Sequence, residues 1–247
     1  MTQHGKNAAA IIIGNEILSG KVADQNAVYL ARVLRSLGVD LQRVVVIPDN
    51  IEIIAEEVSN CRERVDLIFT SGGVGPTHDD VTMEGIASAI GRPLVRHPEL
   101  VHLLRDVYSD ILTPTQMKLA DVPEGTELLY AEGLRIPVIH LQGIYIFPGI
   151  PELFVKKFEA IKERFREPPF HLVRIYLADK EEAIAENLIT AVKRYPEILF
   201  GSYPILHQRD YKIILTLESK DRAYLEEALH FLISTLHEQC IFKIDHS

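Results

Sequence analysis

The predicted architecture of this 247-residue chain rests on one segment, Thr70-Ser-Gly-Gly-Val-Gly-Pro-Thr-His-Asp-Asp-Val-Thr82. It follows an apolar run at 65–69, which predicts a buried strand, and it leads into a helical pattern. The glycines allow a sharp turn and a close approach of the backbone to a ligand. Unpaired amides at the start of the next helix favour an anion. The segment therefore predicts a phosphate-binding loop.

Two adjacent carboxylates, Asp79 and Asp80, lie near the end of this loop. Negative charge next to a phosphate is unfavourable unless a divalent cation lies between the carboxylate and phosphate oxygens. The loop therefore predicts a small phosphorylated ligand that binds together with a metal ion.

Strands and helices alternate around the loop. Continuous apolar runs predict parallel strands, covered on both faces, at 8–13, 41–47 and 67–70. Apolar residues at helical spacing predict helices at 26–37, 51–58 and 81–90. This order is typical of an α/β domain with a doubly wound, mostly parallel sheet.

The second half of the chain changes character. Residues 93–130 are expected to be mostly helical, and Gln142-Gly143 is expected to join strands at 137–141 and 144–147. A helix is expected at 152–165, before a linker at 166–169. The pattern at 170–244 is β-α-β-β-α-β, which predicts a small ferredoxin-like α+β module. We therefore expect an α/β domain at 1–167 and a module at 168–247.

Composition limits the partners. The net charge of −9 argues against a general binder of nucleic acid or of anionic membranes. Cys61 and Cys240 are too few for a disulfide framework and lack the spacing of metal ligands. The apolar run at 8–13 is too short for a signal peptide core or a membrane span. A cytoplasmic protein without nucleic-acid or membrane partners is expected.

Acidic residues follow all three strands of the predicted parallel sheet. The carboxyl ends of such strands meet at one edge, where ligands bind. Carboxylates gathered there repel one another unless a cation or hydrogen bonds compensate. We expect catalytic residues at Asp80, Asp49 and Glu16, and metal ligands at Asp79, Asp80 and Asp49.

Helix capping is the alternative role for the aspartates near helix starts. Capping is the favoured explanation for Asp24. For Asp49 the two explanations stay open, since either Asp49 or Asn50 can cap the next helix. For Asp80 a functional role is favoured, because a cap does not require a preceding glycine turn.

The loop resembles the signature of the molybdopterin-binding domain family of molybdenum-cofactor biosynthesis. Three further segments narrow the resemblance: Gly14-Asn-Glu-Ile-Leu-Ser-Gly20, Asp24-x-Asn26 and Phe147-Pro-Gly-Ile-Pro151. Together they are similar to the N-terminal domain of competence/damage-inducible proteins and to the molybdopterin-binding-like domain of FAD synthases. The family commonly has Gly-Asp-Glu in the first loop, where this chain has Asn15, so an amide replaces one carboxylate.

By this resemblance, Asp49 and Asp80 match the aspartates that adenylylate molybdopterin in cofactor biosynthesis. The expected ligand-binding residues are Gly72, Gly73, Gly75, Pro76, Thr77 and Asn26. The resemblance implies metal-dependent hydrolysis of a nucleotide diphosphate, ADP-ribose or FAD, with release of AMP. The implied ions are Mg²⁺, Mn²⁺ or Co²⁺, with K⁺ as a further candidate, and no tightly bound organic cofactor is expected.

Two other functions remain open. The chain could bind a pterin or an adenine dinucleotide without turnover, or it could be a molybdopterin adenylyltransferase. The last ranks lowest because those enzymes are usually shorter and lack such a C-terminal module. Relatives carry a nicotinamide-mononucleotide deamidase or an adenylyltransferase domain, and we expect that neither of those activities transfers to this chain.

Family resemblance also implies a homodimer or another homo-oligomer. The segment 98–121 carries more apolar residues than one helix needs for its own sheet, and surplus apolar surface commonly marks an interface. These residues are Leu100, Val101, Leu103, Leu104 and Val107. Light scattering at micromolar concentration should show more than one subunit, and a monomer would rule this out.

Overall fold

The apolar runs of the N-terminal half form the centre of a six-stranded sheet in the computed structural model, which describes residues 5–206, 208 and 210–246. The strand order is β2 (Asp40–Ile47), β1 (Asn7–Ile13), β3 (Leu67–Ser71), β8 (Ile144–Phe147), β7 (Val138–Leu141) and β6 (Glu127–Leu129). The first four strands are parallel, and β7 and β6 continue the sheet antiparallel. The expected doubly wound, mostly parallel sheet is confirmed.

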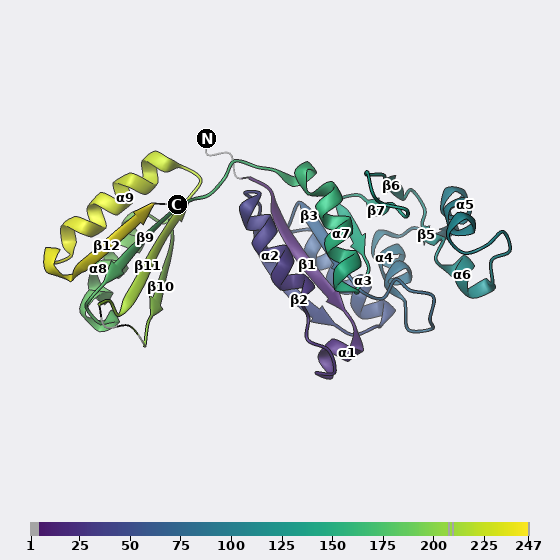
Figure 1. The fold of residues 1–247 in the computed structure, drawn as a ribbon, viewed down its shortest axis with the longest axis horizontal. Coiled ribbons are helices and arrows are strands. Elements are labelled where there is room, and N and C mark those ends of the chain that lie inside the picture. Colours follow the sequence, from purple (N-terminus) through teal and green to yellow (C-terminus); the bar gives the residue numbers. More distant parts are fainter. Residues whose placement is uncertain (1–4, 207, 209, 247) are drawn as a thin grey trace. The chain divides into compact units, whose positions relative to one another are not determined.

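Helices cover both faces of this sheet. Helices α2 (Asn26–Ser36) and α7 (Pro151–Ile161) lie side by side on one face, and α3 (Ile51–Arg62) and α4 (Thr82–Ile90) lie on the other (Figure 1). Successive side chains of β1 point to opposite faces, so Ala8 and Ala10 join one core while Ala9 and Ile11 join the other. This is why β1 is apolar at every position from Ala8 onward.

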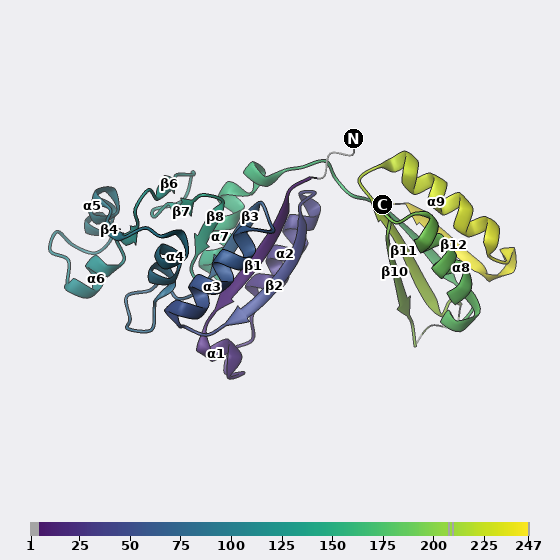
Figure 2. The same cartoon turned by 180° about the vertical axis from the view of Figure 1, so that it is seen from behind.

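A subdomain between α4 and β7 differs from the expected helical stretch. Helices α5 (Pro98–Val107) and α6 (Pro114–Lys118) are present, but β4 (Leu94–Arg96) and β5 (Asp121–Pro123) pair as a short antiparallel ribbon. Figure 2 shows α5 and α6 from behind. The prediction that 93–130 is mostly helical was therefore wrong for the strands β4, β5 and β6. Three-residue strands are too short to show an alternating pattern.

The hairpin between β7 and β8 brings a second segment next to the glycine loop. Gln142 and Gly143 have φ of 49° and 83°, as a tight hairpin turn requires, so the predicted turn is confirmed. The amide of Gly72 donates to the carbonyl of Phe147 over 3.2 Å. A Cβ atom on Gly149 would lie 3.3 Å from the Cα atom of Gly72. Both chain segments are thus in contact at the edge of the sheet.

The chain forms two compact units, 1–167 and 168–247. The first ends after α7 and a 3₁₀ turn, η1 (Lys162–Phe165). The second contains β9 (His171–Leu177), α8 (Glu181–Arg194), β10 (Leu199–Pro204), β11 (Ile213–Ser219), α9 (Arg222–Thr235), η2 (Glu238–Cys240) and β12 (Ile241–His246).

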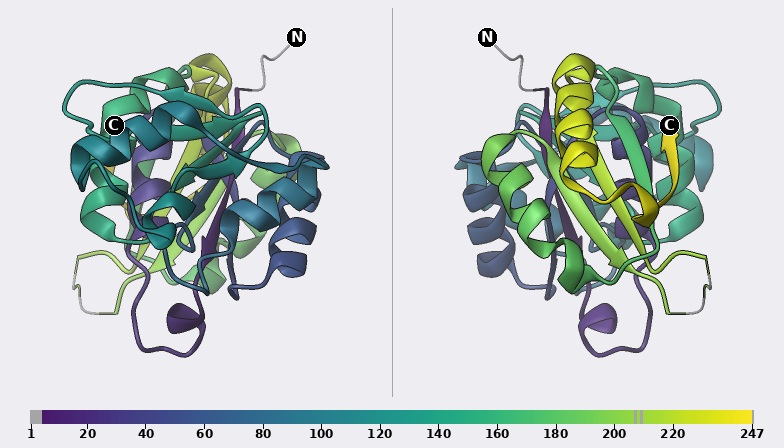
Figure 3. Two further views of the ribbon diagram at one scale, coloured as in Figure 1. Left: turned by 90° about the vertical axis from the view of Figure 1, so that its right-hand side faces the viewer. Right: turned by 90° about the vertical axis from the view of Figure 1, so that its left-hand side faces the viewer.

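The second unit has an antiparallel sheet of order β10-β11-β9-β12, which is the ferredoxin-like arrangement that the sequence predicts. Helices α8 and α9 lie side by side over one face of this sheet (Figure 3, right). Alternate residues of β9, Val173, Ile175 and Leu177, point into the core between the sheet and the two helices. Within the described residues, no helix is both long and apolar enough to cross a bilayer.

The contact between α3 and α4 depends on Gly85. A Cβ atom there would lie 2.4 Å from Cγ2 of Ile54 and 2.6 Å from its Cβ atom. We expect Gly85→Ala to force the helices apart and to lower the free energy of unfolding by about 1–3 kcal/mol, although alanine favours the helix. Urea denaturation measures this change.

The matched control is Ser88→Ala, an exposed position in the same helix. It should leave the stability unchanged or raise it slightly, because alanine is the better helix former and meets no neighbour. Equal stability of Gly85→Ala and the wild type would show that the two helices can move apart without cost.

Candidate active site at the glycine loop

The glycine loop is held against the carboxyl end of β1. Gly72 and Gly73 have φ of 106° and 60°, and a Cβ atom on Gly72 would lie 2.1 Å from the carbonyl oxygen of Ile13. The hydroxyl of Thr82 donates to the carbonyl of Gly72 over 2.9 Å, and the amide of Thr82 donates to the carbonyl of Gly73 over 3.0 Å. The start of α4 therefore fastens the loop, and the position of Gly72 excludes any side chain.

Asp80 lies within the loop and does not cap α4. Its Oδ2 atom accepts from the amide of Thr77 over 2.8 Å and from the hydroxyl of Thr77 over 2.6 Å. The same oxygen is 2.6 Å from where a Cβ atom on Gly75 would stand. Helix α4 begins after Val81 without a side-chain cap. The capping alternative for Asp80 is therefore wrong.

Asp49 lies near Gly73 of the loop. Asn50 caps α3, since its Oδ1 accepts from the amide of Ile53 over 2.9 Å, and this resolves the alternative left open for Asp49. The Oδ2 atom of Asp49 accepts from the amide of Asn15 over 2.8 Å. Its Oδ1 is 3.4 Å from where a Cβ atom on Gly73 would stand. Asp49 is thus available to a ligand on the loop.

The charge of Asp49 is only partly compensated. Burial raises the pKa of Asp49, and the neighbouring carboxylates of Glu16 and Asp79 raise it further, while the hydrogen bond from Asn15 acts in the opposite direction. Glu16 lies exposed in the four-residue helix α1 (Asn15–Leu18). Asp79 is exposed, and the hydrogen bond from the hydroxyl of Thr77, at 2.5 Å, lowers its pKa. Glu16 and Asp79 are thus close enough to Asp49 to disfavour the charged form of its carboxyl group.

These acids do not form a metal site by themselves. Among residues 5–206, 208 and 210–246, no group of three or more His, Cys, Asp or Glu side chains is placed to hold an ion. The expected ligands Asp49, Asp79 and Asp80 are therefore near the same loop without converging on one point. A cation there would need donor atoms from a bound ligand.

Asn26 connects the loops and is not exposed to a ligand. It is 3% exposed, and its Nδ2 donates to Oγ of Ser71 and to the carbonyl of Gly149, each over 2.8 Å. Its Oδ1 is buried without a partner among the described residues.

Asp24 accepts from the amides of Asn26 and Ala27 at the start of α2, over 3.2 and 3.0 Å. This agrees with helix capping, the explanation that the sequence favours for Asp24.

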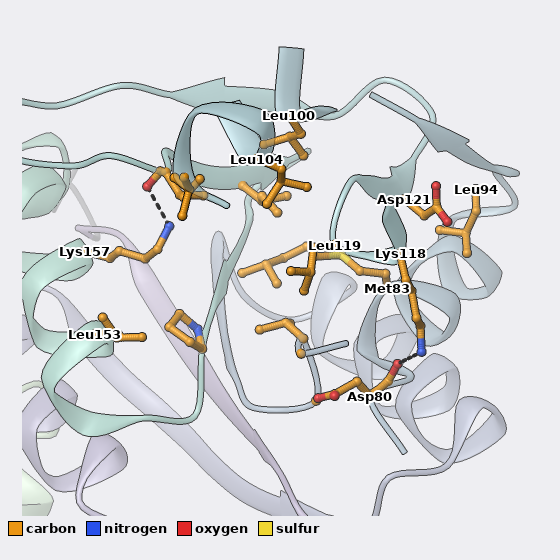
Figure 4. A pocket seen from close by; sticks show the side chains of 18 of the residues that line it. Asp80, Met83, Leu94, Leu100, Leu104, Lys118, Leu119, Asp121, Leu153 and Lys157 are labelled. Atoms are coloured by element: carbon orange, nitrogen blue, oxygen red, sulfur yellow. Dashed lines mark hydrogen bonds between the residues drawn. The ribbon is translucent and has the colours of Figure 1, made fainter. Parts of the chain in front are cut away.

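A cavity of about 250 Å³ opens beside the loop (Figure 4). Gly73, Gly75 and Asp80 line one end. The rest of the lining is mostly apolar side chains from α4, the subdomain, β7, β8 and α7, together with the charged side chains of Glu84, Lys118, Asp121 and Lys157. The other expected site residues lie outside its lining: Glu16, Asn26, Asp49, Gly72, Pro76, Thr77 and Asp79. The glycine loop and the cavity are therefore neighbours that share Gly73, Gly75 and Asp80.

Leu100, Leu104 and Val107 of α5 line this cavity, and the first two are buried. Because these side chains line a cavity within the subunit, they no longer support the prediction of an interface between subunits. The homo-oligomer stays a prediction.

Sequence reasoning missed two lysines at this site. The Nζ atom of Lys118, in α6, donates to the carbonyls of Thr77 and Asp80 over 3.0 and 2.6 Å, so it holds the loop from outside. Lys157, in α7, lines the cavity, and burial lowers its pKa to about 8. Each is an ordinary helical lysine in the sequence, and only the tertiary structure distinguishes them.

Comparison with known proteins identifies two regions. Residues 9–167 match the model of a family described as probable molybdopterin binding domain, and residues 169–245 match the FAD synthase middle domain. A probable FAD synthase of Caenorhabditis briggsae is 29% identical, over 90% of this chain and 48% of that protein. A CinA-like protein of Thermotoga maritima is 28% identical, over 94% of this chain and 59% of that protein. This chain thus spans about half to three-fifths of their length.

Among solved structures, the fold is similar to CinA of Thermoplasma acidophilum, whose function is described as unknown. The TM-score is 0.60 at 30% sequence identity, and the match covers 66% of this chain and all of that one.

The raised pKa of Asp49 predicts how stability changes when its charge is removed. Below its usual pKa of 3.8 the carboxyl group is protonated in both the folded and unfolded states, and it does not affect stability. As the pH rises through the higher pKa of the folded state, ionisation increasingly disfavours folding. We therefore expect Asp49→Asn to melt at a higher temperature than the wild type near neutral pH, and the difference to vanish in acid.

Asp24→Asn is the matched control. It makes the same change at a helix start, where each carboxylate oxygen accepts from a backbone amide and no gain from losing the charge is expected. Its melting temperature near neutral pH should not rise above that of the wild type. A destabilised Asp49→Asn protein near neutral pH would mean that burial and the neighbouring carboxylates do not disfavour the charged form of Asp49.

Proposed function

The chain belongs to the probable molybdopterin binding domain family, and from this premise we propose that it is a metal-dependent pyrophosphohydrolase of a nucleotide diphosphate. The observation that carries the proposal is the placement of two carboxylates against the Gly73–Gly75 turn, Asp49 near Gly73 and Asp80 near Gly75. Water would attack one phosphorus atom of ADP-ribose or FAD, the bridging P–O bond would break, and AMP and a second phosphomonoester would leave.

The donor set fits a hard cation that is shared with the ligand. Mg²⁺ and similar ions are commonly bound by one or two carboxylates together with substrate phosphate oxygens, and the protein does not need a complete cage. Asp49 and Asp80 supply such carboxylates, and the repulsion around Asp49 is what a cation would relieve. When bound, the ion would neutralise charge on the phosphates and favour ionisation of a water molecule.

The residues of the chain position the reaction. The glycine turn lets phosphate oxygens approach the backbone closely. Lys118 and Thr77 hold the segment that carries Asp80, and the amide of Asn15 orients Asp49. Exposed Glu16, close enough to raise the pKa of Asp49, is the proposed acceptor of the proton from water.

Binding without turnover is the second candidate. It is favoured by the bonds from Thr77 to Asp80, which already occupy one carboxylate oxygen, and by Asn15 in the first loop. Incubating the protein with ADP-ribose or FAD and each of Mg²⁺, Mn²⁺ and Co²⁺, with and without K⁺, separates the two. AMP release supports hydrolysis, whereas calorimetric binding without AMP release supports the binding module.

Asp80→Asn is the decisive variant. The amide oxygen can still accept from Thr77, so we expect the variant to fold with a loss of no more than about 1 kcal/mol of stability. Loss of the charge should lower metal-dependent AMP release by about 10²-fold or more. Both AMP release and the melting temperature are measured.

Asp40→Asn serves as the control, because Asp40 begins β2 at the opposite end of that strand from Asp49. It should hydrolyse at the wild-type rate. Near-normal AMP release by a folded Asp80→Asn protein would show that Asp80 is not a metal ligand.

A further inference from the structure

The cavity beside the glycine loop has one strong donor away from the phosphate end. The Nζ atom of Lys157 donates to the carbonyls of Ile136 and Pro137 over 2.9 and 2.5 Å. An ammonium group has three N–H donors, so one remains. Figure 4 shows Lys157 on the opposite side of the cavity from Asp80 and Lys118. A ligand with its phosphate at the loop would place its far end near this lysine.

The lining between these ends is apolar and of limited size. It includes Met83, Leu100, Leu104, Leu119, Ile139 and Ile146. A cavity of about 150 Å³ holds benzene, so about 250 Å³ admits a larger, fused ring. Exposed Tyr108 and Leu153 lie at its margin, where the rest of a ligand can leave. An alkyl chain would fit this lining, but it would leave the remaining N–H of Lys157 unpaired, which is costly in a buried place.

The polar groups of the lining discriminate between ring types. Asp121 is held by Arg96 through two hydrogen bonds of 2.8 and 2.9 Å. Glu84 lies 3.7 Å from Lys118. The carbonyls nearest to Lys157 already accept from it. At the position of Lys157, an exocyclic amino group would therefore meet a donor, whereas a ring carbonyl would accept the remaining N–H.

We propose that the cavity binds an uncharged fused heterocycle that carries ring carbonyl groups, and that Lys157 is the specificity-determining residue that donates to one of those carbonyls. The proposal rests on the proposed function, because it assigns the non-adenylate half of the dinucleotide substrate to this cavity. The lowered pKa of Lys157 agrees with a place in which a charged group has lost water. FAD carries such a ring, whereas ADP-ribose does not.

Riboflavin tests this because it has the carbonyl-bearing ring but no phosphate. The full-length protein is titrated with riboflavin without metal, and quenching of flavin fluorescence reports binding. Lys157→Met should weaken binding at least tenfold, since a hydrogen bond from a charged donor is lost. Lys156→Met, at the exposed neighbouring position in α7, should bind like the wild type. Adenosine should compete at least tenfold more weakly than unlabelled riboflavin.

A second variant covers the case in which Lys157→Met does not fold. Leu153 is 45% exposed and lines the cavity, so Leu153→Trp can fill the entrance without disturbing the core. It should abolish riboflavin binding while its melting temperature stays near that of the wild type.

The kinetics of Lys157→Met give an independent readout. The variant should raise KM for FAD and leave KM for ADP-ribose unchanged, which a purely structural role of Lys157 would not do.

The outcomes separate this inference from the proposed function. Riboflavin binding by the wild type and by Asp80→Asn, without AMP release from any substrate, would refute hydrolysis and support the ring site. AMP release without riboflavin binding would refute the ring site alone. Unchanged riboflavin binding in Leu153→Trp or in folded Lys157→Met, or equal competition by adenosine, would also overturn it.

Discussion

The contact between Gly72 and the carboxyl end of β1 sets the geometry of the site. Because no Cβ atom fits beside the carbonyl of Ile13, the loop after β3 can pass directly over the end of β1. That close passage places Gly73 near Asp49, and it lets Asn26 donate to both Ser71 and Gly149. Three loops distant in sequence are thereby fixed to one another at the edge of the sheet.

Two opposing electrostatic requirements meet on this fixed backbone. The proposed function requires the loop to accept a phosphorylated ligand, and yet carboxylates from three loops lie near it, and burial and neighbouring carboxylates raise the pKa of Asp49. The chain answers part of this charge with hydrogen bonds from Thr77 and Asn15 to Asp80 and Asp49. Lys118 bonds carbonyl groups of the loop and lies 3.7 Å from Glu84, so it stabilises the backbone without a hydrogen bond to Asp49 or Asp80 side chains. The hydrogen bonds from Thr77 and Asn15 go to one oxygen of Asp80 and one oxygen of Asp49.

Local pattern was sufficient for the parts of the fold that repeat along the chain. The apolar runs located β1, β2 and β3, and the glycine segment located the loop with Asp80. Pattern was insufficient where the outcome depends on contacts between distant residues. The choice between Asp49 and Asn50 as the cap depends on the position of the amide of Asn15, 34 residues away. Lys118 reaches Asp80 across 38 residues, and no spacing in the sequence marks that contact.

The subdomain of residues 94–123 shows why a surplus of apolar residues in a sequence does not reveal what those residues contact. Leucines beyond those that one helix stripe can bury have three uses: an interface, a second core or the wall of a cavity. Here α5 provides a small core with Ala120 and Val122 and also lines the cavity. The same subdomain contributes Lys118 to the loop. A change in its packing would therefore alter the glycine loop and the apolar cavity together, which would couple the proposed ring site to the position of Asp80.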